Sequence, residues 1–504
     1  MGVVANSRWN LAAFGFNLAA QFLTVPFVID QIGLAAFGLS GLVLAVCAPF
    51  ALVGTVLGQA LTREMADAWA QDDARGAGRL ANTAAWLCTA FCILGCPLLI
   101  LLGPMVLEVL AHSQQDSQEA WLLFAAAALG WAAQQFGFVF QGAAAARQQY
   151  ALIARASAWS ALLTVLAILA ITAAHPTPAG YLLAVSVGFT ASALMVILAV
   201  SGPSGVVRLT MRPDRGAARR LLGFGKWQAV SQLAGTLGNQ IDRYLLGALA
   251  PVSVVGQYNA ANRLQEAAYA GVMKGSEVLF PRFGAMGAST VSERAQYFLL
   301  ASWVVMVFSA AVLAPLIPLA DALLTLWVGP EVADGGAIIM KTLVLGGLIG
   351  AGTNVFTYYT LGSGRPAQIA RISLAYAAVT IVASLLLLTL LGPMAAGAGL
   401  VVASVFRLAA SLLLAHRGLF AGSGLSALLQ STLVPMSIGT GLAYGLLLVN
   451  LPAVNSWGQV AGQYTAIAGA VVVLCTGSLG VSKVGRKLFA DLLCAGRPSH
   501  PPGA

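Results

Sequence analysis

Three helix-length apolar segments carry polar and charged side chains that recur along one face. In the segment from Phe224 to Leu249, at about 100° per residue, the polar positions fall within roughly a third of the helical wheel; they are Gln228, Ser231, Gln232, Asn239, Asp242 and Arg243. The next segment has Asn259, Asn262, Arg263, Glu266, Lys274 and Glu277, and the first segment has Asn6, Asn10, Asn17, Gln21 and Thr24. A charge inside a membrane helix costs about 2.5 kcal/mol or more unless it faces protein or a water-filled cavity. We therefore expect these faces to line a polar, partly charged lumen.

Basic groups outnumber acidic groups at membrane depth. Four cations lie well inside their segments and are expected to bind the substrate: Arg243, Arg263, Lys341 and Arg407. Lys274 is a fifth cation, and the acids at similar depth are Asp242, Glu266 and Glu277. If all are ionised, the net charge is +2 (5 − 3), which favours an anionic guest. Because guanidinium groups bind phosphate through paired hydrogen bonds, a phosphate or pyrophosphate group is the predicted guest.

The remaining stripe residues have less definite roles. The uncharged positions expected to line the lumen are Asn17, Gln21, Gln228, Gln232, Asn239, Asn259 and Asn262. The three acids could couple transport to a proton or a sodium ion, or could simply be counter-ions. Alternatively, the cations could reach outward to the membrane interface, or pair at i,i+3, as Arg263 with Glu266 and Lys274 with Glu277. The sequence leaves these alternatives open.

The elements that position these side chains are membrane helices. The chain has 504 residues, of which 59% are hydrophobic and 9% charged, and its mean hydropathy is +0.85. These values lie outside the balance of a soluble globular protein. Fourteen windows of about 20 residues, each long enough to span the hydrocarbon core, recur as far as about residue 482. We predict an all-α polytopic membrane protein with about fourteen transmembrane helices.

The basic residues predict the orientation. Arginines occur in alternate loops, whereas the intervening loops, around residues 30–37, 103–118, 174–178, 250–257, 319–334, 392–396 and 451–459, contain no Lys or Arg. Short cytoplasmic loops retain positive charge, so both termini are expected in the cytoplasm. This pattern also explains the net charge of +9 without nucleic-acid binding.

The chain is expected to contain two similar bundles. An ungapped offset of 218 residues (227 − 9) aligns Trp9 with Trp227 and Gly38 with Gly256, and the polar stripes coincide at the same offset. Six spans in each half predict a parallel repeat about an axis along the membrane normal. The expected parts are six-helix bundles at 1–200 and 224–420, a basic cytoplasmic linker at 201–223, two additional helices at 427–482 and a cytoplasmic tail at 483–504.

Enzymatic chemistry is not indicated. The four histidines are far apart, and no phosphate-binding loop or HExxH motif occurs,. Cys88, Cys92 and Cys96 follow an i, i+4, i+8 spacing that could suggest a soft-metal site. We interpret them as small packing residues between helices, because no His or acid accompanies them. No cofactor or metal is expected.

Three stretches resemble bacterial polysaccharide exporters of the O-antigen flippase type, within the multidrug/oligosaccharidyl-lipid/polysaccharide (MOP) exporter superfamily. They are residues 17–38, residues 221–264 and the sequence Val278-Leu279-Phe280-Pro281. The resemblance implies two six-helix bundles in a V around a central cavity, with two further helices. It also implies alternating-access movement of an undecaprenyl-pyrophosphate-linked oligosaccharide to the outer leaflet, for polysaccharide or lipopolysaccharide biosynthesis.

Partners and rival functions follow from that resemblance. The implied partners are the lipid-linked glycan and membrane lipids, with a polysaccharide polymerase or chain-length machinery as a further candidate. A lipid II flippase is the nearest alternative. A multidrug cation antiporter should show an excess of buried carboxylates and about twelve spans. A membrane polymerase or ligase is disfavoured, because the outward loops are short and lack Lys and Arg.

Overall fold

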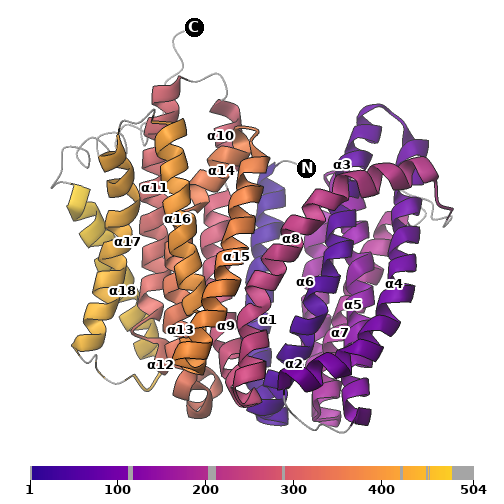
Figure 1. Ribbon diagram of the computed structural model, residues 1–504, viewed down its shortest axis with the longest axis horizontal. Helices are drawn as coiled ribbons and strands as arrows, with labels where there is room; N and C mark the ends of the chain where they lie inside the picture. The colour runs from indigo at the N-terminus through magenta and orange to yellow at the C-terminus, as the bar shows by residue number, and fades with distance from the viewer. Residues whose placement is uncertain are drawn as a thin grey trace. The chain divides into compact units, whose positions relative to one another are not determined.

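The computed structural model describes residues 3–111, 117–201, 212–277, 279–286, 290–420, 424–449, 452 and 454–479. Within these ranges the regular secondary structure is entirely helical (Figure 1). The chain divides into two compact units, Met1–Gln257 and Tyr258–Ala504. The prediction of an all-α protein is confirmed.

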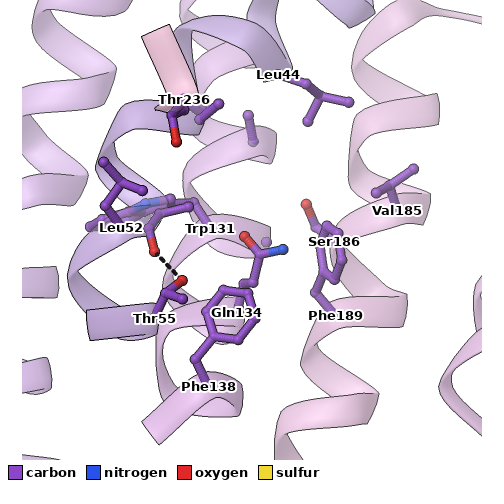
Figure 2. Close-up of a pocket in the computed structure, with 15 residues that line it drawn as sticks. Leu44, Leu52, Thr55, Trp131, Gln134, Phe138, Val185, Ser186, Phe189 and Thr236 are labelled. Carbon is purple, nitrogen blue, oxygen red and sulfur yellow. Dashed lines mark hydrogen bonds between the residues drawn. The ribbon is translucent and has the colours of Figure 1, made fainter. Parts of the chain in front are cut away.

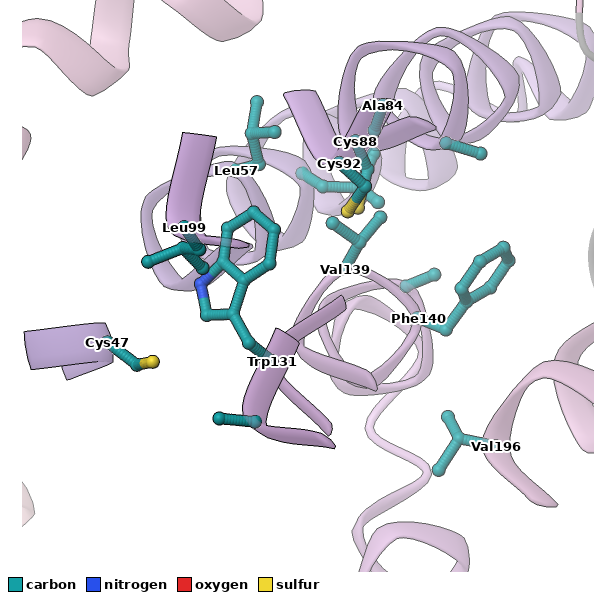
Figure 3. Packing of buried hydrophobic residues seen from close by; sticks show 14 of the residues in the cluster. Cys47, Leu57, Ala84, Cys88, Cys92, Leu99, Trp131, Val139, Phe140 and Val196 are labelled. Carbon is teal, nitrogen blue, oxygen red and sulfur yellow. The ribbon is translucent and has the colours of Figure 1, made fainter. Parts of the chain in front are cut away.

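In its described residues, the first unit contains the helices α1 to α8 and the start of α9 (Val252–Glu277). Its elements are α1 (Val3–Ile32), α2 (Leu34–Cys47), η1 (Ala48–Ala51), α3 (Leu52–Ala70), α4 (Ala74–Ala111), α5 (Ser117–Ala146), α6 (Tyr150–Ala167), η2 (Ile168–Thr172), α7 (Pro178–Ser201) and α8 (Arg215–Leu249). Helix α5 is central, because α3, α4 and α7 all pack against it. The rings of Phe50 and Phe91 hold Trp131 of α5, at centroid distances of 6.4 and 5.4 Å. Cys88 and Cys92 lie in the same apolar core (Figure 3), whereas Cys494 lies outside the described residues.

A glutamine side chain accepts a backbone hydrogen bond near the junction of α2 and α3. The segment η1 is a 3₁₀ turn that contains Pro49, between α2 and α3. Just beyond it, the backbone N–H of Gly54 donates to Oε1 of Gln135 at 2.7 Å. Gln135 is fully buried, so this bond satisfies groups that would otherwise be orphaned inside the core,.

The second unit contains the remaining helices. Its elements are α9 (Val252–Glu277), α10 (Leu279–Ala285), α11 (Val291–Leu313), η4 (Ala314–Leu316), α12 (Ala320–Val328), α13 (Pro330–Ala351), α14 (Asn354–Gly362), α15 (Pro366–Leu391), η5 (Pro393–Ala395), α16 (Ala398–Gly418), α17 (Leu425–Leu448) and α18 (Trp457–Leu479). Helix α16 packs against α13 and α15, and the final pair packs against α11. The hydroxyl of Tyr464 on α18 donates to the carbonyl oxygen of Val312 at 2.8 Å. Leu448 and Val473 are exposed on the final pair.

The fourteen predicted spans fall on helical segments, one of which, Leu34–Ala70, consists of α2, η1 and α3. Among the described residues, eleven helical segments are long and apolar enough to cross a membrane. The three spans outside that set are α1, α8 and α9, which carry the polar stripes. Polar residues lower the mean hydropathy of α8 and α9, whereas the described apolar part of α1, Leu18–Ile32, is shorter than the helices of that set. The chain is a multi-pass membrane protein.

Helix α8 extends further toward the N-terminus than expected. It begins at Arg215, within the segment expected to be a linker, and the side chain of Asp214 caps it by accepting from the backbone N–H of Ala217 at 2.7 Å. Residues 202–211 and the expected tail at 483–504 lie outside the described residues. Helix α8 packs against α3 and α4 in the first unit, although the sequence analysis assigned it to the second bundle. The predicted bundle boundaries stay a prediction.

Candidate substrate-binding site

Arg407 lies near the middle of α16, in the second unit. Small buried residues on the same helix, including Ala403 and Ser404, allow α16 to pack closely on its neighbours. The guanidinium carbon of Arg407 lies 5.4 Å from the ring centroid of Tyr376 on α15. Among the described residues, no carboxylate forms an ion pair with Arg407. Arg407 makes no hydrogen bond to any described residue, so its N–H groups are available to a ligand,.

A second tyrosine near this arginine contacts a further polar residue. The hydroxyl of Tyr269 on α9 donates to Oδ1 of Asn354 on α14 at 3.4 Å, and it lies within electrostatic reach of Arg407. Two glycines on α13 lie beside these residues, and a side chain at Gly347 would displace the amide of Gln265. A Cβ added at Gly350 would lie 3.6 Å from Oγ of Ser404, and one added at Gly347 would lie 2.6 Å from Nε2 of Gln265. We call Gln265, Tyr269, Asn354, Tyr376, Ser404 and Arg407 the Arg407 cluster.

Asn354 adds an uncommitted donor to the Arg407 cluster. Its side chain is 3% exposed. Within the described part of the chain, its Nδ2 has no hydrogen-bond partner. A buried N–H group without an acceptor costs about 1–3 kcal/mol. The cluster therefore combines a positive charge with an unmet donor, which suits an anion or a polar oxygen.

Lys341 has an acidic partner that the sequence analysis did not consider. Its Nζ lies 2.6 Å from Oδ2 of Asp321, and the two side chains are 21% and 64% exposed. Asp321 was treated as part of an outward loop, but it belongs to the short helix α12, which packs on α13. Including Asp321 reduces the predicted net charge from +2 to +1 (5 − 4). Lys341 is therefore a weaker candidate for substrate binding than Arg407.

The other two predicted cations belong to different units. Arg243 lies on α8 in the first unit, and its Nη1 donates to Oε1 of Gln240 at 2.6 Å. Arg263 is half-buried on α9 in the second unit. The grouping of these cations with Arg407 in one lumen stays a prediction.

The three predicted acids have different surroundings. Asp242 is buried on α8. Glu266 is exposed and accepts from Nδ2 of Asn262 at 2.7 Å. Glu277 is exposed and forms the i,i+3 ion pair with Lys274 at 3.0 Å. Of the three, only Asp242 is buried.

The predicted lining residues are also distributed over both units. In the first unit, Gln21 and Asn239 are exposed, and Nε2 of Gln232 donates to Oε1 of Gln59 at 3.0 Å. In the second unit, Asn259 and Asn262 are buried. The side chains of Asn17 and Gln228 lie outside the described residues.

Comparison with known proteins places the chain in a family. The profile of the family described as "Polysaccharide biosynthesis protein" matches residues 3–286. The chain belongs to this family. No curated protein matches its sequence at a significant level. The family resemblance inferred from the sequence is confirmed.

Solved structures agree on the fold. An inward-facing multidrug resistance MATE family transporter of the MOP superfamily has a TM-score of 0.72 at 14% identity, covering 81% of this chain and 94% of that one. The lipid II flippase MurJ, in an inward closed conformation, has a TM-score of 0.72 at 10% identity and covers 97% and 100%. A MOP superfamily transporter from Pyrococcus furiosus has a TM-score of 0.58 at 15% identity and covers 84% and 96%. The chain therefore has the MOP fold. Because the match to MurJ covers 97% of this chain, it extends over most of α17 and α18.

Proposed function

We propose that this protein flips an undecaprenyl-pyrophosphate-linked oligosaccharide from the inner to the outer leaflet of the bacterial inner membrane. Its family and its MOP fold support the proposal. The observation that carries it further is Arg407, which lies mid-helix against an aromatic ring, with no carboxylate paired to it among the described residues. A cation at that depth is costly, and an anionic ligand would offset the cost.

The chemistry of the Arg407 cluster matches a pyrophosphate. The planar guanidinium of Arg407 presents paired N–H donors, which fit two phosphate oxygens at once. Nδ2 of Asn354 supplies another donor, and the hydroxyl of Ser404 lies on the same helix as Arg407. Arg263 and Arg243 would bind the anionic head group at other stages of transport. Lys341 would contribute only after leaving Asp321.

The proposed cycle is alternating access by movement of the two units, as in other transporters built from repeats. The anionic head would stay in the polar lumen while the lipid tail stays in the bilayer. An inside-negative membrane potential favours outward movement of an anion by about 2.3 kcal/mol per charge per 100 mV. If a proton or sodium ion also drives the cycle, Asp242 is the acid best placed to bind it, since it is buried.

A lipid II flippase is the second candidate. The comparison with MurJ covers nearly the whole of both chains and favours it. Both substrates share a pyrophosphate and a long isoprenoid, so the Arg407 cluster would serve either. A multidrug cation antiporter is disfavoured, because a cationic substrate would be repelled by Arg407.

The test is a flipping assay in sealed vesicles. Purified protein is reconstituted with the lipid-linked oligosaccharide, and a lectin outside the vesicles measures how much glycan becomes exposed. The variant Arg407→Gln removes the charge while keeping a polar side chain. We expect this variant to bind the head group at least tenfold more weakly, since a hydrogen bond to a charged group is worth about 1.5–3 kcal/mol. The assay should therefore show slower exposure of the glycan.

Arg371→Gln is the matched control, because Arg371 is an exposed arginine on α15, the helix that carries Tyr376. It should leave flipping unchanged. Flipping that is equally fast with wild-type protein and with Arg407→Gln would contradict the role of Arg407. Exposure of lipid II but not of the oligosaccharide lipid would favour the second candidate.

A further inference from the structure

The first unit contains a pocket of about 420 Å³ whose lining has no charged residue (Figure 2). Helices α2, α3, α5, α7 and α8 enclose it together with η1, and all of these elements belong to the first unit. The volume lies in the range of small-molecule sites, about 300–1,000 Å³. The cations named in the proposed function, Arg407, Arg263, Arg243 and Lys341, do not line this pocket.

One face of α5 builds the wall of the pocket. Ala127, Gly130, Trp131, Gln134 and Phe138 lie at i, i+3, i+4, i+7 and i+11, which is a helical stripe,. Phe189 of α7 lies across from Phe138 and is also half-buried, so two aromatic faces remain partly open. Trp131 is packed deeper, between Phe50 and Phe91.

The polar side chains of the pocket fall into two classes. The hydroxyls of Thr55 and Ser186 are already engaged, because they donate to the carbonyl oxygens of Ala51 at 3.2 Å and Ala126 at 2.7 Å. Gln134 and Thr236 make no hydrogen bond to any described residue. Figure 2 shows the amide of Gln134 between Trp131 and Phe189, with the hydroxyl of Thr236 directed toward the same space.

Another polar atom lies in the core behind this pocket wall. In the described structure, the indole Nε1 of Trp131 is buried and has no hydrogen-bond partner. Together, Gln134 and Thr236 offer both donors and acceptors to one small volume,. This arrangement therefore suits a ligand with several hydroxyl or amide groups.

We infer that this pocket binds an uncharged sugar ring of the lipid-linked glycan. A sugar ring has an apolar C–H face, which packs on the side chains of Phe138 and Phe189. Its hydroxyls at the rim bond to Gln134 and Thr236. The inference rests on the proposed function, and it assigns the glycan and the pyrophosphate to different sets of residues.

Other occupants fit less well. An isoprenoid tail would leave the amide of Gln134 and the hydroxyl of Thr236 without partners. An organic cation would find aromatic rings but no carboxylate among the lining residues,. A phosphate would find no positive charge there. A neutral, hydroxyl-rich ring satisfies both the polar and the apolar parts of the wall.

The experiment compares two ligands that differ only in the sugar. Purified protein in lipid nanodiscs is titrated with undecaprenyl pyrophosphate carrying the oligosaccharide, and separately with bare undecaprenyl pyrophosphate. Gln134→Leu and Thr236→Val replace polar groups by apolar groups of similar size. Each should weaken binding of the glycosylated lipid by about fivefold, which is a typical loss for one hydrogen bond. Binding of the bare lipid should not change.

Two controls make the outcome specific. Gln118 is an exposed glutamine near the start of α5, the helix that carries Gln134. The Gln118→Leu variant should bind both lipids as the wild type does. Arg407→Gln should weaken both lipids equally, because it acts on the pyrophosphate. Thermal unfolding of each variant checks that the fold is intact.

The possible failures are distinguishable. Equal binding of the glycosylated lipid by wild-type protein, Gln134→Leu and Thr236→Val would overturn the inference alone. Tighter binding of the bare lipid by Gln134→Leu would instead identify an isoprenoid site, and would also overturn it. If wild-type protein binds neither lipid, the proposed function fails together with the inference.

Discussion

The interiors of the two units offer different chemistry. The second unit places a guanidinium and a buried amide donor together in the Arg407 cluster. The first unit instead has an uncharged pocket with partly open aromatic rings and the uncommitted side chains of Gln134 and Thr236. A lipid-linked glycan has an anionic part and a neutral part, which would match these two kinds of site. Under the proposal, the charged head group and the uncharged sugar would then contact different units.

Reversing the charge at Arg407 should have the largest effect. A small effect would contradict the assignment of the anionic head group to the second unit. We expect Arg407→Glu to abolish export, with affinity for the pyrophosphate lipid reduced more than about 100-fold, because attraction is replaced by repulsion. Arg407→Lys should be intermediate, since it keeps the charge but loses the planar paired donors. Binding titrations and polysaccharide export in cells measure both effects.

Two adjacent glutamines in the first unit should behave differently. Gln135→Leu leaves the buried N–H of Gly54 without its acceptor, and it should destabilise the protein by about 1–3 kcal/mol,. Gln134→Leu should leave stability unchanged, because Gln134 makes no hydrogen bond to any described residue. Thermal unfolding in detergent measures the difference. Similar losses for both variants would mean that Gln134 also has a structural role.

Releasing Lys341 from its partner should have a smaller effect. Asp321→Asn removes the ion pair, so the ammonium group of Lys341 becomes available to an anionic ligand. We expect binding of the pyrophosphate lipid to tighten about threefold at low salt and less at high salt, because exposed charges are screened. The double variant with Lys341→Gln should lose this gain. A gain that persists in the double variant would exclude Lys341 as its source.

The smallest effect is expected for the exposed ion pair on α9. Lys274→Gln and Glu277→Gln should each change stability by less than about 1 kcal/mol, the usual limit for exposed pairs,. Transport should persist in both variants. Loss of ion-driven transport in Glu277→Gln would instead make Glu277 a coupling group, and would weaken the case for Asp242.

The long helices were predictable because a membrane imposes one simple requirement. Backbone N–H and C=O groups in hydrocarbon must be paired within the segment, so about 20 apolar residues are enough to predict a helix. The stripes on α1, α8 and α9 were also readable, since side chains three and four residues apart share a face. Asp321 was not predictable as the partner of Lys341, because a short helix between longer ones resembles a loop in the sequence.

The sequence by itself determined the membrane class, the helices and the family, since these depend on local hydropathy, helical periodicity and recurring residues. Only the tertiary structure decided which polar groups are already satisfied. Gln134 and Gln135 are neighbours of one type, yet one faces a pocket and the other bonds to Gly54 across a helix contact. Asn354 and Arg407 likewise meet Tyr269 and Tyr376 only after α9, α14, α15 and α16 pack together. Hydrogen bonds and ring contacts act over a few ångströms, so the residues that share a site are fixed by packing between helices far apart in the chain.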